Sequence, residues 1–224
     1  ITGNASIHSG SSSAAIYWPA QCELTIGGNA TVTGGTGIDV RRGVVTIQDS
    51  AVITAIGNYS QTTIIAGASK NDGSALQIGS QFYDGPLTVN LNGGTLKSEK
   101  GNAISVVNTQ NNSQPTQLTL TGTNLQAAHL PIEFFVPAEP DTVFSSGSLQ
   151  ASSDQTILNI PTGNSDVVAA RILTSGDKQL LAFYSSVDSA FNAATGGTLY
   201  LLADTQLPLL SLTDPDLTVI TAPG

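Results

Sequence analysis

The chain has 224 residues, of which 40% are hydrophobic and only 10% are charged, against about 25% charged residues in an average globular protein. Sixteen acidic and seven basic side chains give a formal net charge of −9. This balance excludes a basic, phosphate-neutralising surface for nucleic acid, and no apolar run reaches the roughly 20 residues that a membrane-spanning helix needs. The single cysteine, Cys22, excludes an internal disulfide framework.

The beginning of the chain lacks the features of a complete precursor. It starts with Ile1, contains no methionine and has no charged segment followed by an apolar leader. We therefore expect it to be a processed or excised part of a longer protein with flanking domains. The scarcity of lysine and the abundance of serine and threonine favour an extracellular location, at the cell surface or in the cell wall, without membrane insertion.

Internal repetition is the main signal of the sequence. Three kinds of short alternating segment recur in a fixed order, separated by turns rich in glycine, asparagine and serine. The first kind lies at 15–18, 38–40, 76–78 and 104–106. The second kind lies at 24–26, 45–47, 87–89 and 118–120, and the third at 30–32, 51–53, 95–96 and 125–126. Each unit is therefore expected to contain three short strands.

Three strands in a unit of about 22 residues leave no room for a helix, which predicts an all-β fold, a right-handed parallel β-helix. Strands of one kind then stack about 4.8 Å apart around a continuous core. The period-two alternation predicts two outward columns, which are Thr25, Thr46, Thr88 and Thr119, and Tyr17, Asp39, Gln77 and Ser105. A sandwich of antiparallel hairpins is the competing fold, disfavoured because similarity recurs per coil and not per hairpin.

The later part of the chain departs from this regularity. Long loops are predicted at 57–74 and 108–117, and long loops on a rigid scaffold often carry function. Strands are predicted at 132–136 and 156–160, followed by a hairpin of 167–173 and 179–183. Apolar residues at 187, 190, 191 and 194 predict a short helix that ends at Gly196-Gly197, before strands at 198–202 and 217–221. We therefore expect a β-helix over 1–165 and a strand–helix–strand module over 166–224.

Two stretches resemble known proteins. The repeats in GGNATVTGGTGIDVRRGVVTIQDSAVITA (27–55) resemble repetitive β-helix regions of bacterial cell-surface proteins, the pectate-lyase-like superfamily in the broad sense. The segment SSVDSAFNAATGGTLYLLADTQL (185–207) resembles the helix-then-strand element with which such β-helices commonly begin. The resemblance implies a large modular surface protein in which 166–224 opens a further β-helix.

The same superfamily contains pectate lyases and polygalacturonases, so the resemblance also implies an enzymatic alternative. Such lyases use calcium-binding aspartates with a lysine or arginine base, and such hydrolases use clustered aspartates with a Gly-His-Gly segment. Neither His8 nor His129 lies in a Gly-His-Gly segment. The chain is therefore not expected to be an enzyme, and a polysaccharide lyase or glycoside hydrolase with a site in the 57–74 loop remains the alternative.

The carboxylates also lack the expected spacing. A general acid and its partner carboxylate lie about 5–10 Å apart. Asp39 and Asp49 fall in one coil, but no neighbouring coil supplies a matching aspartate in either column. We interpret Arg41 and Arg42, beside the Gly43 turn, as a solvated corner. No catalytic residue is predicted.

No metal site is predicted, although calcium remains open as a cofactor. Residues 34–39 (GGTGID) match the start of the calcium-binding nonapeptide of β-roll toxins, whose ions lie between tandem copies. Only one copy is present, and Arg41 replaces the large apolar residue that the motif needs. A proline-fixed turn accounts for Asp214-Pro215-Asp216.

Aromatic side chains are the candidate ligand contacts, because exposed aromatic faces stack on sugar rings. The candidate residues are Tyr17, Trp18, Tyr59, Phe82 and Tyr83, together with Asp39 in the outward column. Tyr17 is expected to face outward and Trp18 inward. The sequence thus favours a non-catalytic extracellular module of a bacterial surface protein, acting in adhesion, in contact with polysaccharide or host glycan, or as a stalk.

Overall fold

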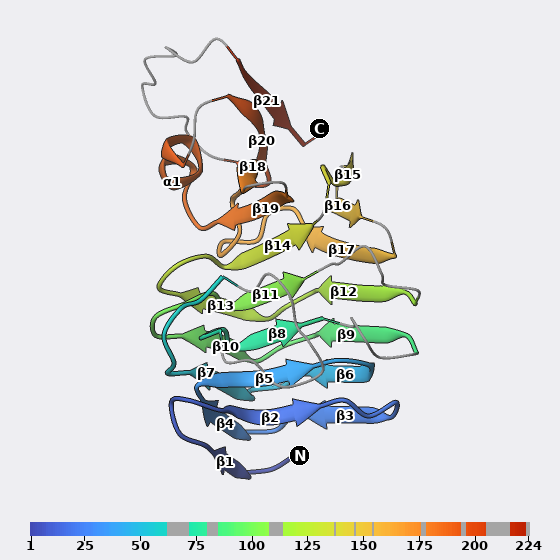
Figure 1. Cartoon of the computed structure of the whole chain (residues 1–224), viewed down its shortest axis with the longest axis vertical. Coiled ribbons are helices and arrows are strands. Elements are labelled where there is room, and N and C mark those ends of the chain that lie inside the picture. Colours follow the sequence, from blue (N-terminus) through green and yellow to red (C-terminus); the bar gives the residue numbers. More distant parts are fainter. Residues whose placement is uncertain are drawn as a thin grey trace.

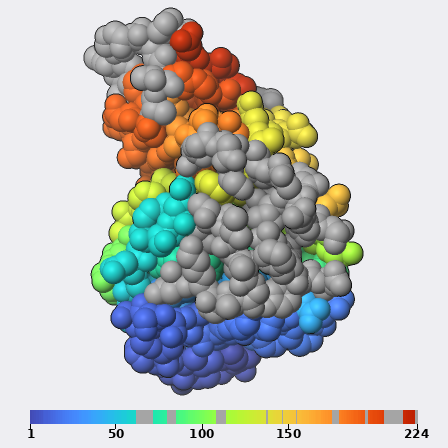
Figure 2. Space-filling view, in the orientation of Figure 1, coloured from blue at the N-terminus to red at the C-terminus, as the bar shows by residue number. Residues whose placement is uncertain are grey.

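The computed structural model describes residues 1–61, 72–79, 85–107, 114–136, 138–145, 147–153, 155–175, 178–193, 196–204 and 216–222. Figure 1 shows strands in successive layers along the long axis, with the two termini at opposite ends, and Figure 2 shows the same elongated outline with its atoms filled in. The one helix within these residues is α1 (Val187–Asn192). No helix in this part of the chain has the length and apolar character needed to cross a membrane.

Three sheets of stacked strands form the body of the molecule, and each contains one kind of repeated segment. The first sheet contains the third kind, the second sheet the first kind and the third sheet the second kind. The first sheet contains β1 (Ser6–His8), β4 (Thr31–Gly34), β7 (Val52–Ala55), β10 (Thr95–Ser98) and β13 (Asn124–Ala127). The second begins with β2 (Ala14–Trp18), β5 (Thr36–Val40), β8 (Leu76–Ile78), β11 (Ile104–Val107) and β14 (Ile132–Val136). The third includes β3 (Glu23–Ile26), β6 (Gly43–Ile47), β9 (Leu87–Leu91), β12 (Thr116–Leu120) and β17 (Thr156–Pro161). All these neighbours are parallel, as the repeats predict, and the arrangement is β-helix-like.

Columns of aliphatic side chains in register build the core of this stack. One column is Leu24, Val45, Val89 and Leu118. Another is Ile38, Leu76, Ile104 and Ile132. Every member of both columns is at most 7% exposed. Full burial of such a side chain stabilises the fold by about 1.5–3 kcal/mol, and stacking repeats this gain at each layer, which is how strands of three to five residues become stable.

The outward threonine column differs from the prediction at one position. Thr25 pairs with Thr46, but Thr46 pairs with Asn90 and not with Thr88. Asn90 in turn pairs with Thr119. The part of β9 that pairs with residues 45–47 is 89–91 and not the predicted 87–89, so the predicted register of β9 is wrong by two residues. Because side chains alternate with a period of two, this shift changes the neighbours of Thr88 but keeps it on the predicted face.

Beyond β14 the neighbouring strands become antiparallel. The second sheet continues through β19 (Lys178–Tyr184), β18 (Ala169–Ser175), β20 (Gly197–Leu201) and β21 (Leu217–Thr221). Of these contacts only β20 with β21 is parallel. The predicted hairpin and later strands are confirmed, and the helix begins at Val187 as predicted but ends at Asn192, before Gly196-Gly197. Residues 176–177, between the two hairpin strands, lie outside the described residues. Because β19 pairs with β14, the second sheet runs unbroken from 1–165 into 166–224, and the domain boundary stays a prediction.

Three strands do not follow from the sequence pattern. They are β1 at the N-terminal end, and β15 (Asp141–Phe144) and β16 (Ser148–Ser153), which extend the third sheet beyond β17. Both β15 and β16 pair in antiparallel fashion. Strand β15 has no buried residue, and its Val143 is 62% exposed. In β16 the alternation is limited to Leu149 and Ala151, which are buried among polar residues.

The helix α1 packs on the outer face of the second sheet against β18, β19 and β20. Ser186 caps its start by accepting a hydrogen bond from the backbone N–H of Ser189 at 3.1 Å. At its other end the buried Arg171 donates to the carbonyls of Ala190, Phe191 and Gly196. A cation at this end complements the negative end of the helix dipole and satisfies carbonyls that lack helical partners.

Candidate functional site

A row of polar side chains crosses the outward face of the second sheet. Asp39, Gln77, Ser105 and Glu133 occupy equivalent positions on β5, β8, β11 and β14, and Tyr17 on β2 begins the row. The first four of these positions, from Tyr17 to Ser105, are the predicted outward column. The four residues from Asp39 to Glu133 are nevertheless at most 5% exposed. Buried polar groups need partners, so the contacts of this row determine its role.

At one end of the row Asp39 belongs to a buried ion pair. Its Oδ2 lies 2.9 Å from Nη2 of Arg41, and both side chains are 0% exposed. The guanidinium of Arg41 also lies 5.9 Å from the centre of the Tyr17 ring. The prediction of a solvated corner is therefore wrong for Arg41. Residues two positions apart in an extended chain lie on the same face, so Arg41 lies beside Asp39 and neutralises its charge. Arg42 is half-buried and donates to the carbonyl of Pro19.

At the other end of the row Glu133 anchors a group of side chains that we call the Glu133 cluster: Tyr59, Gln61, Asn102, His129 and Glu133. The Tyr59 hydroxyl donates to Oε2 of Glu133 at 3.1 Å, and Nε2 of Gln61 donates to Oε1 at 3.3 Å. Nδ2 of Asn102 also donates to Oε2. Three donors thus compensate the carboxylate for the hydration that it loses on burial.

His129 is the exposed member of the Glu133 cluster. Its ring stacks on that of Tyr59, with 4.3 Å between the ring centres and 29° between the planes. Its Nδ1 lies 2.9 Å from Oδ1 of Asn102, and the same oxygen accepts a hydrogen bond from the backbone N–H of Leu130 at 3.2 Å. The cluster therefore connects a buried carboxylate to a surface imidazole through one amide side chain.

The electrostatics of the Glu133 cluster keep Tyr59 a hydrogen-bond donor. Burial raises the pKa of its hydroxyl, and the charge of Glu133, the hydrogen bond to Glu133 and the charge of Asp72 raise that pKa further. A phenol that already titrates near pH 10 in water therefore stays protonated under all ordinary conditions. The ring is held in place for stacking, and its hydroxyl has no role as a base.

The aromatic candidates on β2 lie away from the Glu133 cluster. Tyr17 and Trp18 are half-buried neighbours on β2 that point to opposite faces of the second sheet. Tyr17 lies against Arg41, and Trp18 packs against the core, as expected for an inward-facing residue. Phe82 and Tyr83 fall outside the described residues. Of the four candidates that the structure describes, only Tyr59 lies in the Glu133 cluster.

Sequence reasoning did not connect Tyr59 with the rest of the Glu133 cluster. Tyr59 and Glu133 are 74 positions apart. One signal was available: the outward column that ends at Ser105 extends by one layer to Glu133, because the strand at 132–136 was predicted. The contributions of Asn102 and His129 had no such signal, since both lie in turns before strands and outside the alternating pattern.

The two carboxylates of the polar row do not form a glycosidase pair. Asp39 and Glu133 are three strand spacings apart, which is about 14 Å at about 4.8 Å for each spacing. Acid–base pairs of glycosidases are separated by about 5–10 Å. Asp49 is not part of the row, because its Oδ2 accepts from the backbone N–H of Gly28 at 2.8 Å at a corner of the stack. This row therefore contains no pair of carboxylates at catalytic spacing.

Metal-binding side chains do not gather in the described part of the chain. No group of three or more histidine, cysteine, aspartate or glutamate residues there could hold a metal ion. Residues 36–39 of the calcium-like motif lie within β5, and the carboxylate of Asp39 is paired with Arg41. The expectation of no metal site, with calcium left open as a cofactor, stays untested.

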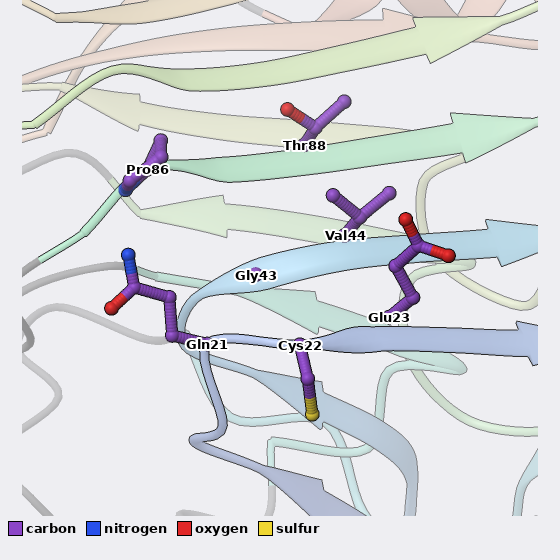
Figure 3. Close-up of a pocket in the computed structure, with 7 residues that line it drawn as sticks. All are labelled: Gln21, Cys22, Glu23, Gly43, Val44, Pro86 and Thr88. Carbon is purple, nitrogen blue, oxygen red and sulfur yellow. The ribbon is translucent and has the colours of Figure 1, made fainter.

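A separate hollow of about 310 Å³ lies over the third sheet, between the starts of β3, β6 and β9. Its lining includes Cys22, Gly43, Pro86 and Thr88. Figure 3 shows the thiol of Cys22 pointing away from Pro86 and Thr88. Glu23 is the one charged residue among the described residues of this lining, so they contain no acid–base pair.

Comparison with known proteins adds no relative: no protein family matches the chain, and neither a curated protein nor a solved structure matches it.

Proposed function

We propose that this chain is a non-catalytic, right-handed parallel β-helix module of an extracellular bacterial surface protein, belonging in the broad sense to the pectate-lyase-like superfamily, and that it contacts glycan through the Glu133 cluster. The observation that carries the proposal is the exposed His129 ring stacked on Tyr59. Carbohydrate sites combine aromatic faces with a few fixed polar groups. The amide of Gln61, half-buried beside the same carboxylate, supplies such a group.

The state of the carboxylates supports contact without chemistry. Asp39 is neutralised by Arg41, and Glu133 receives three hydrogen bonds. A carboxylate that serves as nucleophile or general acid must reach its substrate, whereas both of these are almost completely buried. The continuous parallel ladders also make the module stiff along its axis, which suits a stalk that presents the cluster away from the cell.

A glycan array probed with the unmodified chain and two variants tests the proposal. Tyr59→Phe keeps the ring that stacks on His129, whereas Tyr59→Ala removes it. We expect the unmodified chain to retain at least one class of glycan, Tyr59→Phe to bind nearly as well, and Tyr59→Ala to bind at least about tenfold more weakly. If the unmodified chain retains no glycan, the contact role is wrong and only the stalk remains.

The enzymatic alternative, a polysaccharide lyase or glycoside hydrolase, is tested separately. The chain is incubated with polygalacturonate and with neutral polysaccharides, with and without calcium, and the products are separated by size. We expect neither unsaturated nor shortened products. Either product would overturn the non-catalytic assignment and direct attention to the 57–74 loop.

A further inference from the structure

The side-chain amide of Asn102 has only one orientation that satisfies its neighbours. The backbone N–H of Leu130 is 3.2 Å from Oδ1, and a backbone N–H can only donate. On the other side Nδ2 donates to Oε2 of Glu133 and, at 3.1 Å, to the hydroxyl oxygen of Ser105. Exchanging the oxygen and nitrogen would place a donor against a donor and an acceptor against a carboxylate. Asn102 is almost fully buried, so water cannot relieve either clash.

This orientation fixes the tautomer of His129. Because Oδ1 of Asn102 is an acceptor, Nδ1 of His129, 2.9 Å away, must carry the hydrogen. A neutral imidazole has one N–H and one bare nitrogen, so Nε2 of His129 then holds a lone pair. Within the described part of the chain Nε2 forms no hydrogen bond. The exposed ring therefore presents an acceptor nitrogen. Asn102, which is itself held by Glu133, fixes the orientation of the ring.

We propose that Nε2 of His129 accepts a hydrogen bond from a hydroxyl group of a neutral glycan, with Asn102 as the positioning residue. This inference rests on the proposed glycan contact and names its ligand class. Sugar hydroxyls are donors, and the ring of His129 places its acceptor beside the aromatic surface on which a sugar would stack. An acidic polysaccharide is disfavoured, because the chain carries a net charge of −9 and none of the five residues of the cluster is a lysine or arginine.

The chain contains a matched control for this inference. It has only two histidines, and the second, His8, lies on the edge strand β1 and is also exposed. His8 forms no side-chain hydrogen bond with the part of the chain that the structure describes. The two rings therefore differ in the presence of an orienting amide, and signals from one can be compared with those from the other.

Nitrogen-15 NMR of the histidine rings in the whole chain tests the tautomer. Spectra are recorded near pH 8, where imidazole is neutral, and His8→Phe assigns the two sets of signals. We expect His129 to be held as the Nδ1–H form and His8 to show the averaged signals of an unconstrained ring. Asn102→Leu removes the acceptor and releases His129 toward the behaviour of His8. An Nε2–H form of His129 in the unmodified chain overturns the inference, whether or not Asn102→Leu folds.

Binding measurements then test the ligand class. The probes are cellohexaose, mannohexaose and hexa-N-acetylchitohexaose, with trigalacturonic acid as the anionic comparison. His129→Phe keeps an aromatic ring on Tyr59 but removes the acceptor, and we expect it to bind the best neutral probe about tenfold more weakly, while His8→Phe binds normally. Equal binding by His129→Phe, or preference for trigalacturonic acid, overturns this inference and leaves the glycan contact standing. No binding by the unmodified chain overturns the glycan contact itself and this inference with it.

Discussion

The outward face of the second sheet carries different residues in the parallel stack and in the antiparallel layer above it. From β5 to β14 this face carries the polar row that ends at Glu133. On β19, the next strand, the position opposite Glu133 is Ala182, which belongs to an apolar cluster covered by α1. In the row through Glu133 the polar residue on β14 is followed by Ala182 on β19, while Phe135 on β14 already belongs to the apolar cluster and the buried Arg171 lies opposite Ala182. The Glu133 cluster lies at this border, and its exposed residue His129 lies on the polar side.

The two regions also use a buried arginine differently. Arg41 and Arg171 are both 0% exposed. In the stack Arg41 neutralises a carboxylate on its own strand face, whereas in the antiparallel layer Arg171 holds three backbone carbonyls at the end of α1. One arginine therefore stabilises a sheet face and the other fixes a helix on a sheet. Removing either should affect its own region first.

The largest effect is expected from Arg41→Met. The variant leaves the carboxylate of Asp39 buried without its cation, and breaking a buried pair in this way costs about 3–5 kcal/mol. Urea unfolding followed by the fluorescence of Trp18, the single tryptophan, measures the loss. The double variant Asp39→Leu/Arg41→Met replaces the pair with apolar groups and should recover most of the stability. A double variant as unstable as Arg41→Met would show that the ion pair stabilises the fold through interactions other than the neutralisation of its two charges.

Arg171→Met should have a smaller and more local effect. Hydrogen bonds from a charged donor contribute about 1.5–3 kcal/mol each. The total loss of stability is smaller than their sum, because water hydrogen-bonds to the carbonyls that the arginine releases. We expect a loss of about 2–3 kcal/mol that is confined to α1, β18 and β20. Hydrogen exchange should accelerate there and stay unchanged in β5, β8 and β11. Uniform acceleration throughout the chain would mean that the two regions unfold as one unit.

A corner of the stack provides a still smaller test. Asp49 has a φ of 59°, a conformation that costs a residue with a side chain about 1–2 kcal/mol, and its carboxylate accepts from the N–H of Gly28. Asp49→Ala keeps the strain and loses the hydrogen bond, so we expect a loss of about 1 kcal/mol. Asp49→Gly loses the same bond but removes the strain, and urea midpoints should place it above Asp49→Ala. The reverse order would contradict this explanation of the corner.

The smallest effect concerns Tyr59 and is confined to alkaline solution. The folded chain holds the Tyr59 proton more tightly than an unfolded chain does, because its pKa is raised by burial and by Glu133. Tyrosine in an unfolded chain titrates near pH 10, so the stabilisation is complete below about pH 10 and is lost as the pH rises above it. Burial also raises the pKa of Tyr184. Tyr59→Phe should therefore flatten the fall in stability above about pH 10 only in part, and no flattening at all would contradict the contact with Glu133.

Alternation and repetition in the sequence predict the stack but not what covers it. The columns through Ile38, Leu76 and Ile104 follow from aliphatic residues at a period of two, and they are present in the structure. The same alternation predicts that Asp39 lies on the outward face, and the structure buries Asp39 on that face. Periodicity reports the direction of a side chain relative to its own sheet, and the packing of distant segments decides whether that direction leads to water.

The Glu133 cluster illustrates the same limit for function. Its residues come from a loop after β7, two turns and one strand, and each lies in a local sequence that suggests nothing about the others. His129 in Ala-His-Leu gives no sign of an orienting amide. Asn102 becomes informative only when the stack brings it between Glu133 and His129. Such a site can be found from three-dimensional contacts but not from spacing along the chain.

The most direct test of this account is to locate the glycan contact by NMR. The best neutral probe from the binding measurements is titrated into the isotope-labelled chain, and shifts of backbone and side-chain signals are mapped. The account predicts the largest shifts at His129, Tyr59 and Gln61, with Tyr17 and Trp18 unaffected. Shifts centred on Tyr17, or on the hollow beside Cys22, would contradict it.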